Sequence, residues 1–277
     1  MILSPLAQER RHYRRARARR STLVALASTL VFAAAVVLGV TSAPGWPRVQ
    51  ETFFDVRVGW ESLPAIAAGL WLNVRVLVVA QIGVLALGLL IAVLRTLRGP
   101  VFFPLRALAT GYVDLFRGVP LLIALYLIGF GLPALRLQGI PSDTAVLGTI
   151  TLILIYSAYV AEVFRAGIES VHPSQRAAAR SLGLSHRQSM RLVILPQAVR
   201  RVLPPLLNDF VALQKDVGLI SVLGAVDAIR AAQIASARTF DFTPYVVAAL
   251  LFVLLAVPTG RIADAVAARA TRQQGLA

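Results

Sequence analysis

The sequence predicts an all-α, polytopic membrane protein with about six transmembrane helices. Of its 277 residues, 57% are hydrophobic and only 15% are charged, whereas a typical soluble domain carries about 25% charged residues. Four uncharged runs of roughly 20 residues are each long enough to cross an apolar layer about 30 Å thick. No alternating pattern of the kind found in membrane barrels is present. Because lipid offers no hydrogen-bond partners to the backbone, these runs must be helices.

The predicted spans follow one another with short connections. Four are clear from their composition, at residues 22–40, 76–94, 144–161 and 243–260. Two are less uniform, at about 112–132 and about 202–226, and the second of these contains Lys215 and Asp216. The domain organisation expected from this order is a basic tail (1–21), a first span with its loop (22–62), a main transmembrane domain (63–269) and a short tail (270–277).

The distribution of basic residues predicts the orientation of the chain. Of 28 Lys and Arg residues, 20 fall in the four alternate segments that share one side of the membrane. The other side holds 5, and 3 lie in spans or at their ends. Positive charge is enriched on the cytoplasmic side, so both termini are expected in the cytoplasm of a bacterial cell, with the chain in its inner or plasma membrane.

Several other functions are disfavoured by the composition. The net charge of +15 is explained by arginines beside apolar spans, where anionic lipid head groups attract them, so nucleic-acid binding is not expected. With no cysteines and three scattered histidines, no metal site is predicted, and no catalytic constellation stands out. A cleaved signal peptide remains an alternative for the first span, although its apolar run is longer than usual. The loop after it carries aromatic residues typical of a membrane surface.

A polar stretch at residues 171–196 predicts two short helices joined at a glycine. Pro173 suits a first helical turn, where its missing N–H is not needed. Gly183 suits the left-handed residue that follows a helix. Ser185 and Gln188 have the spacing of a capping box at the start of the next helix.

That second helix is expected to end near Leu195, because Pro196 disfavours the α conformation in the residue before it. The helix pair is too small to have its own core. It is therefore expected to pack either on its own membrane domain or on a partner.

The ordered run from residue 158 to residue 216 resembles the permease subunit of ATP-binding-cassette importers of the polar amino-acid uptake type. The family's loop carries Glu-Ala-Ala, then Gly, then Ile-Leu-Pro, and this chain has Ala177-Ala178-Ala179, Gly183 and Ile194-Leu195-Pro196. Residues 112–128 resemble the family's third span. The likeness covers roughly residues 63–269, a five-span core, and leaves the first span outside it.

The resemblance implies that the helix pair is a coupling helix that docks in a groove of a separate ATPase. The residues carried over to this coupling loop are Ser174, Gln175, Ala177, Ala178, Ala179, Leu182, Gly183, Leu184, Ser185 and Pro196. The chain departs from the family where Ala177 replaces the motif glutamate, where Ser174 replaces a glycine, and where Val217-Gly218 replaces Thr-Ser. The loss of the glutamate puts the strength of docking in question.

Ionisable residues inside spans usually face a bundle interior or a cavity. On this basis a substrate pathway or gate is expected at Arg117, Glu162, Arg165, Asn208, Lys215 and Asp216. Structural readings remain open for each of them: an ion pair of Lys215 with Glu162 or an aspartate, helix-end positions for Glu162 and Arg165, and a structural position for Arg117.

The expected function is that of a permease subunit in an ATP-driven importer of polar amino acids. The only lysine, Lys215, is not in a Walker A setting, so ATP and Mg²⁺ are expected on the ATPase and no cofactor on this chain. The expected partners are ATPase subunits, a second permease that is the same or a related chain, an extracytoplasmic binding protein, lipid and the amino acid. The alternatives are a permease for another small solute, a membrane scaffold or sensor, and an intramembrane enzyme.

Overall fold

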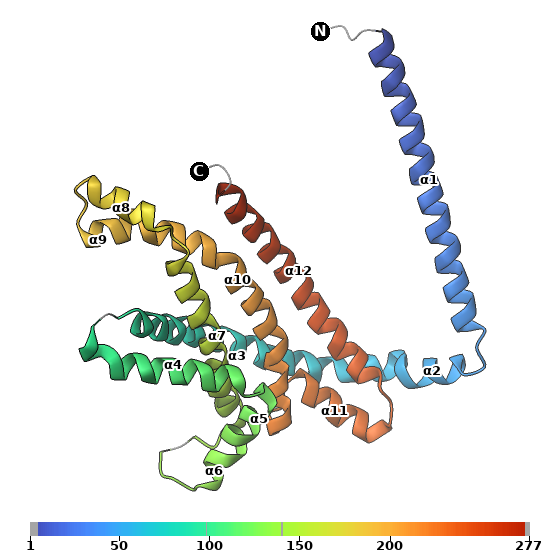
Figure 1. Ribbon diagram of the computed structural model, residues 1–277. Coiled ribbons are helices and arrows are strands. Elements are labelled where there is room, and N and C mark those ends of the chain that lie inside the picture. The colour runs from blue at the N-terminus through green and yellow to red at the C-terminus, as the bar shows by residue number, and fades with distance from the viewer. Residues whose placement is uncertain (1–4, 98, 140, 275–277) are drawn as a thin grey trace. The chain divides into compact units, whose positions relative to one another are not determined.

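The computed structural model describes residues 5–97, 99–139 and 141–274, and the regular elements in these ranges are all helices (Figure 1). The chain separates into two compact units, one that ends at Asp55 and one that begins at Val56. The first unit holds α1 (Pro5–Thr41) and α2 (Trp46–Phe53). The span predicted at 22–40 lies within α1. The aromatic loop after this span contains α2, whose apolar Trp46, Val49 and Phe53 share one face.

The second unit is built around two long helices, α3 (Val56–Thr96) and α7 (Thr144–Glu169). Two further long helices, α10 (Leu195–Asp216) and α12 (Thr243–Gln274), pack against them. The remaining elements are η1 (Pro100–Phe102), α4 (Phe103–Gly118), α5 (Leu121–Tyr126), η2 (Leu127–Gly131), α6 (Leu132–Ala134), α8 (Pro173–Ser181), α9 (His186–Ser189), η3 (Met190–Ile194), η4 (Val217–Leu223) and α11 (Ala228–Thr239).

The main core lies where α3, α7 and α10 meet. Val84 of α3, Leu152 of α7 and Leu213 of α10 are buried there in one apolar cluster. Gly88 lets α3 and α7 approach closely, because a Cβ at this position would lie 2.8 Å from the side chain of Val160. The predicted spans at 76–94 and 144–161 are therefore parts of longer helices whose inward faces form this core.

The span predicted at 112–132 is wrong as a single helix. The segments before and after residues 119–120 are bent by 106°. Pro120 has no N–H to continue the helix, and Val119 before it is extended, with φ −88° and ψ 126°. Among the described residues, four helices are long and apolar enough to cross a membrane, or up to six if each of two bent pairs counts as one span.

The predicted end of a helix near Leu195 is also wrong. The chain passes from α9 through the π-helical η3 directly into α10, and Leu195 stays helical with φ −60° and ψ −44°. Leu195 donates its N–H to the carbonyl of Met190, five residues earlier. In a π turn each N–H bonds to the carbonyl five residues earlier instead of four. This shift comes just before Pro196, so the helix continues although the proline has no N–H to donate.

Helix α11 was not predicted, because its alanine-rich sequence is interrupted by Arg230, Gln233 and Arg238 and gives no long apolar run. It begins after the left-handed Gly224, which has a φ of +92°. Ala228 and Ala232 are fully buried against Ile66 of α3 and Ala248 of α12. The structure thus uses small residues, rather than large apolar ones, to pack this short helix.

A buried polar cluster fixes α11 to α3. The Asn73 side chain donates to the Asp227 carboxylate at 2.9 Å and to the Val217 carbonyl at 3.2 Å, and it accepts from the Ala228 N–H at 3.1 Å. Asp227 also caps α11 by accepting from the Arg230 N–H. Asn73 and Asp227 are both fully buried, so removal of the Asn73 side chain leaves buried polar groups of α11 and η4 without a partner.

Replacing Asn73 with alanine is expected to lower the free energy of unfolding by about 2 kcal/mol, because buried groups lose their partners. Tryptophan fluorescence on heating the detergent-solubilised chain measures this change. Thr151→Val is the matched control, since Thr151 is equally buried but its hydroxyl bonds only to the Leu147 carbonyl of its own helix. Equal losses for the two variants would contradict the assigned importance of the cluster.

Candidate functional site

The polar stretch forms the predicted pair of short helices, α8 and α9. Pro173 is in the first turn of α8, and Gly183 is left-handed with a φ of +77°. The Leu184 N–H donates back to the Ala179 carbonyl at 3.1 Å, which closes the end of α8. The hydroxyl of Ser185 accepts from the Gln188 N–H, while the Gln188 side chain accepts from the Ser185 N–H. The local signals in the sequence are therefore confirmed.

The helix pair packs against η3, just before α10, and exposes its other side. Val171, Ile194 and Ala198 form a small buried cluster beneath it. Ala177 and Leu182 are exposed, and 81% of the Leu182 surface is accessible. Of the other predicted loop residues, Ala179 is buried, Leu184 is partly buried, Pro196 lies further along in α10, and the exposed ones are Ser174, Gln175, Ala178, Gly183 and Ser185.

Next to the base of this pair, α4, α7 and α10 enclose a cleft made of two adjoining cavities of about 440 Å³ and about 410 Å³. Arg117, Tyr159 and Asp209 line both cavities. The cavity nearer the helix pair is also lined by Glu162, Ser170 and Arg201, and the other by Tyr156 and Asp216.

The cleft carries opposite charges. The Arg117 guanidinium lies 5.7 Å from the centre of the Tyr159 ring, a cation–π distance. Asp216 accepts a hydrogen bond of 2.7 Å from the Tyr156 hydroxyl. In the described part of the chain, the Oδ2 atom of Asp209 is buried without a hydrogen-bond partner. A small ligand with both a negative and a positive group could therefore be bound here.

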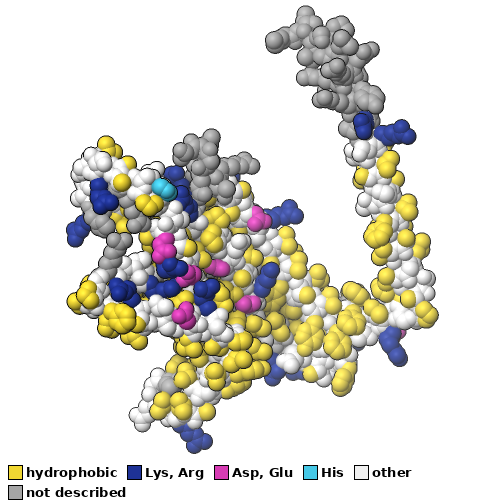
Figure 2. Space-filling model, in the orientation of Figure 1, with side chains coloured by type: hydrophobic (Ala, Val, Ile, Leu, Met, Phe, Trp, Pro, Cys, Tyr) yellow, Lys and Arg dark blue, Asp and Glu magenta, His cyan; other side chains and the backbone are white. Residues whose placement is uncertain are grey.

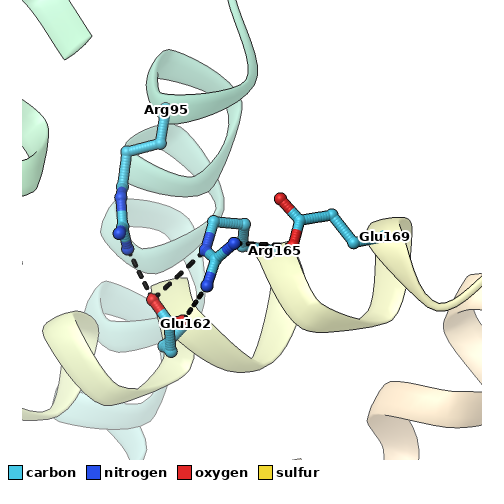
Figure 3. Close-up of polar contacts among 4 residues, drawn as sticks. All are labelled: Arg95, Glu162, Arg165 and Glu169. Atoms are coloured by element: carbon cyan, nitrogen blue, oxygen red, sulfur yellow. Dashed lines mark hydrogen bonds and ion pairs between the residues drawn. The ribbon is translucent and has the colours of Figure 1, made fainter.

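A chain of ion pairs joins α3 to α7 beside this cleft (Figure 3). Arg95 of α3 reaches Glu162 of α7 at 2.6 Å. Arg165 binds the other oxygen of Glu162 and also Glu169, the latter at 2.6 Å. At the end of α7, Arg201 of α10 donates to the Ser170 carbonyl. Figure 2 shows acidic and basic side chains together on this flank of the second unit.

The six predicted pathway residues lie in three different places in the structure. Arg117, Glu162 and Asp216 line the cleft. Arg165 belongs to the ion-pair chain, whereas Asn208 and Lys215 are on the exposed face of α10. The ion pair considered between Lys215 and Glu162 does not form, because Glu162 is held by Arg95 and Arg165.

Sequence reasoning missed Asp209 and the two tyrosines, Tyr156 and Tyr159, as cleft residues. A signal for Asp209 was present, because Asp209 and Asp216 are seven residues apart and so share a helical face. Asn208 and Lys215 have the same spacing and were predicted instead, but they lie on the neighbouring, exposed face of α10.

A polytopic bundle of helices with an exposed polar helix pair beside an open cleft is the architecture of a membrane transport component. Residues 84–272 match the family described as binding-protein-dependent transport system inner membrane component, and the chain belongs to this family. It is a multi-pass inner-membrane permease subunit rather than an enzyme, and it works with a binding protein and a separate ATPase.

Similar proteins agree with this assignment. The chain is 36% identical to the probable glutamine ABC transporter permease protein GlnM of Bacillus subtilis over 207 residues, 74% of this chain and 92% of GlnM. It is 32% identical to the arginine transport system permease protein ArtQ of the same organism, over 70% and 86% of the two chains.

A solved amino acid ABC transporter with histidines superposes with a TM-score of 0.71 at 33% identity, covering 78% of this chain and 98% of that one. An inward-facing structure of the MetNI methionine ABC transporter has a TM-score of 0.58 at 19% identity, and it supports the fold alone.

Proposed function

We propose that this chain is the permease subunit of an ATP-driven importer of polar amino acids. The observation that carries the proposal is a cleft lined by both Arg117 and Asp209, in which the buried Oδ2 atom of Asp209 has no hydrogen-bond partner among the described residues. An amino acid has a carboxylate for the first and an ammonium for the second. The names of the similar permeases, for glutamine and arginine, support a polar amino acid.

In this proposal, α8 and α9 lie in the cytoplasm and dock in a groove of the ATPase through their exposed side. The exposed apolar side chains of Ala177 and Leu182 supply contact area there, with Ala177 at the position of the family's motif glutamate. ATP and Mg²⁺ bind to the ATPase, and this chain holds no cofactor. Closure of two ATPase subunits moves the helix pair, and the bundle alternates between outward-open and inward-open states.

Reconstitution tests the proposal as a whole. The chain is co-purified with its ATPase, placed in proteoliposomes and supplied with a binding protein loaded with labelled amino acid. ATP-dependent uptake, with ATPase activity stimulated by the loaded binding protein, is the expected result. Stimulation without uptake would favour a sensor, and uptake of an uncharged solute in place of amino acids would favour a different permease.

The orientation is tested separately. Because the chain has no cysteines, Leu182→Cys introduces one exposed thiol in the helix pair. A membrane-impermeant maleimide is expected to label it in inside-out vesicles and not in intact cells. Labelling from the outside would place the helix pair away from any cytoplasmic ATPase and would refute the docking role.

Replacing Asp209 with asparagine is expected to reduce uptake by about tenfold, because a charge-assisted hydrogen bond to the substrate ammonium becomes a neutral one. The amount of ATPase that co-purifies should not change. Asp264→Asn is the matched control, since Asp264 is exposed on α12 and does not line the cleft. Wild-type uptake by the Asp209 variant would remove this residue from the substrate site.

A further inference from the structure

The end of α7 and the beginning of α10 cross in direct contact. Gly167 of α7 lies against Val202 of α10, because a Cβ added at Gly167 would overlap the Val202 side chain. Both residues are buried. Val171, just beyond α7, packs with Ile194 and Ala198 in the small buried cluster beneath the helix pair. Because Gly167 and Val202 also line the cavity nearer the helix pair, this crossing connects the helix pair to the cleft.

A hydrogen bond from Arg201 of α10 joins the two helices at this crossing. Its guanidinium donates to the carbonyl of Ser170, the C-cap residue of α7. The last carbonyls of a helix have no partner within the helix and carry partial negative charge, so a guanidinium stabilises them by hydrogen bonding and by charge. Arg201 and Ser170 also line the cavity of about 440 Å³. The hydrogen bond therefore holds together two walls of the cleft.

The chain itself connects the helix pair unequally to α7 and α10. On one side, α9 continues through η3 into α10 without a break in the helix. On the other side, the non-helical His172 separates α7 from α8. A movement of the helix pair is therefore passed directly to α10, but it reaches α7 through the contacts at the crossing. Since Tyr159 and Glu162 of α7 line the cleft, these contacts determine whether both walls move.

We propose that Arg201 is a positioning residue that couples movement of the helix pair to the cleft. By binding the Ser170 carbonyl, it makes the end of α7 follow α10 when the ATPase moves the helix pair. Without this hydrogen bond, the helix pair still docks and ATP is still hydrolysed, but α7 no longer follows α10 and the cleft changes less. The inference rests on the proposed permease function, and it adds the residue on which the coupling of hydrolysis to transport depends.

Arg201→Met tests this role, because methionine is an unbranched side chain that donates no hydrogen bond. In proteoliposomes with a loaded binding protein, the number of ATP molecules hydrolysed per amino acid imported is expected to rise about tenfold. Arg201→Lys retains a donor for the Ser170 carbonyl and should stay within about threefold of the original ratio. Arg261→Met is the matched control, since Arg261 is exposed on α12 and lines neither cavity. A fall in uptake and hydrolysis together, with an unchanged ratio, would show a structural role only and would overturn the inference.

A cysteine in the cleft reports the movement without any substrate. The chain has no cysteines, and Ala166 is an exposed residue of α7 that lines the cavity nearer the helix pair. In the complex with a cysteine-free ATPase, a non-hydrolysable ATP analogue is expected to change the rate at which Ala166→Cys reacts with a maleimide by about fivefold. With Arg201→Met added, the change should fall below about twofold. An equal response in both proteins, or none in the protein that keeps Arg201, would overturn the inference.

Gly167→Ala tests whether the crossing carries the coupling. The added methyl group overlaps Val202 and pushes α7 and α10 apart, so the ratio of hydrolysis to import is expected to rise about fivefold. Val202→Ala in the same chain removes the overlapping methyl groups and should return the ratio to within about twofold of the original. A double variant with the same ratio as Gly167→Ala would overturn the role of the crossing.

Uptake and the cysteine reporter separate this inference from the proposed function. Uptake with an unchanged hydrolysis ratio in Arg201→Met would keep the proposed function and overturn the inference. A nucleotide response at Ala166→Cys that depends on Arg201, in a complex that shows no uptake, would support the inference and count against the permease function.

Discussion

Replacing Gly183 with valine is expected to abolish ATP-driven uptake while the chain still inserts in the membrane. Gly183 has a φ of +77°, a region that costs an ordinary residue about 1–2 kcal/mol and a β-branched residue more. The added side chain meets no atom within 4 Å, so the effect is backbone strain and not a clash. The strain is relieved when α9 turns relative to α8, which spoils the surface offered to the ATPase.

Co-purification with the ATPase and uptake in proteoliposomes measure this effect. Gly139→Val is the matched control, because Gly139 also has a positive φ of +87° and also meets no neighbouring atom, but lies outside the helix pair. The control should keep both activities.

Deletion of residues 175–190 should likewise leave an inserted chain that no longer co-purifies with the ATPase, and retained co-purification would refute the docking role.

Reversal of the charge at Glu162 is expected to be the most destabilising single change. The carboxylate is 25% exposed and is shared by Arg95 and Arg165, of which Arg95 is only 14% exposed. Glu162→Lys places a third positive charge between two arginines and should lower the free energy of unfolding by about 3–5 kcal/mol. Uptake should fall with it, because α3 and α7 lose the ion pair that joins them beside the cleft.

Glu169→Lys separates this effect from a general loss of charge. Glu169 binds the same Arg165 but is 58% exposed, so solvent screens its charge and the expected loss is about 0–1 kcal/mol. Unfolding of both variants is followed by tryptophan fluorescence in detergent. Equal destabilisation by the two changes would show that burial of the carboxylate is not what makes Glu162 important.

The apolar spans could be predicted from the sequence because lipid requires apolar side chains and internally bonded backbone along the whole of each span. The helix pair could be read as well, since Pro173, Gly183 and the capping box at Ser185 act through local backbone geometry. The conformations at these positions depend on neighbours only a few residues away in the sequence.

The features that could not be predicted from the sequence depend on contacts between distant residues or on the hydrogen bonding of the preceding turn. The bend at Pro120 and the passage of the helix through Pro196 involve the same residue type with opposite results, because only the second is preceded by a π turn that shifts the hydrogen bonds. Helix α11 is held by Asn73, more than 150 residues earlier. Asp209 faces the cleft and Asn208 does not, and this difference follows from how α10 is rotated against α7.

The π turn between α9 and α10 leaves the segment from His186 to Asp216 continuously helical, although Pro204 and Pro205 lie inside it. This segment begins with α9 in the polar helix pair, and its other end forms a wall of the cleft. By contrast, α7 and α8 are separated by the non-helical His172. A displacement of α9 would therefore act on Asp209 and Asp216 through one continuous helical segment, whereas the break at residue 172 uncouples α8 from α7.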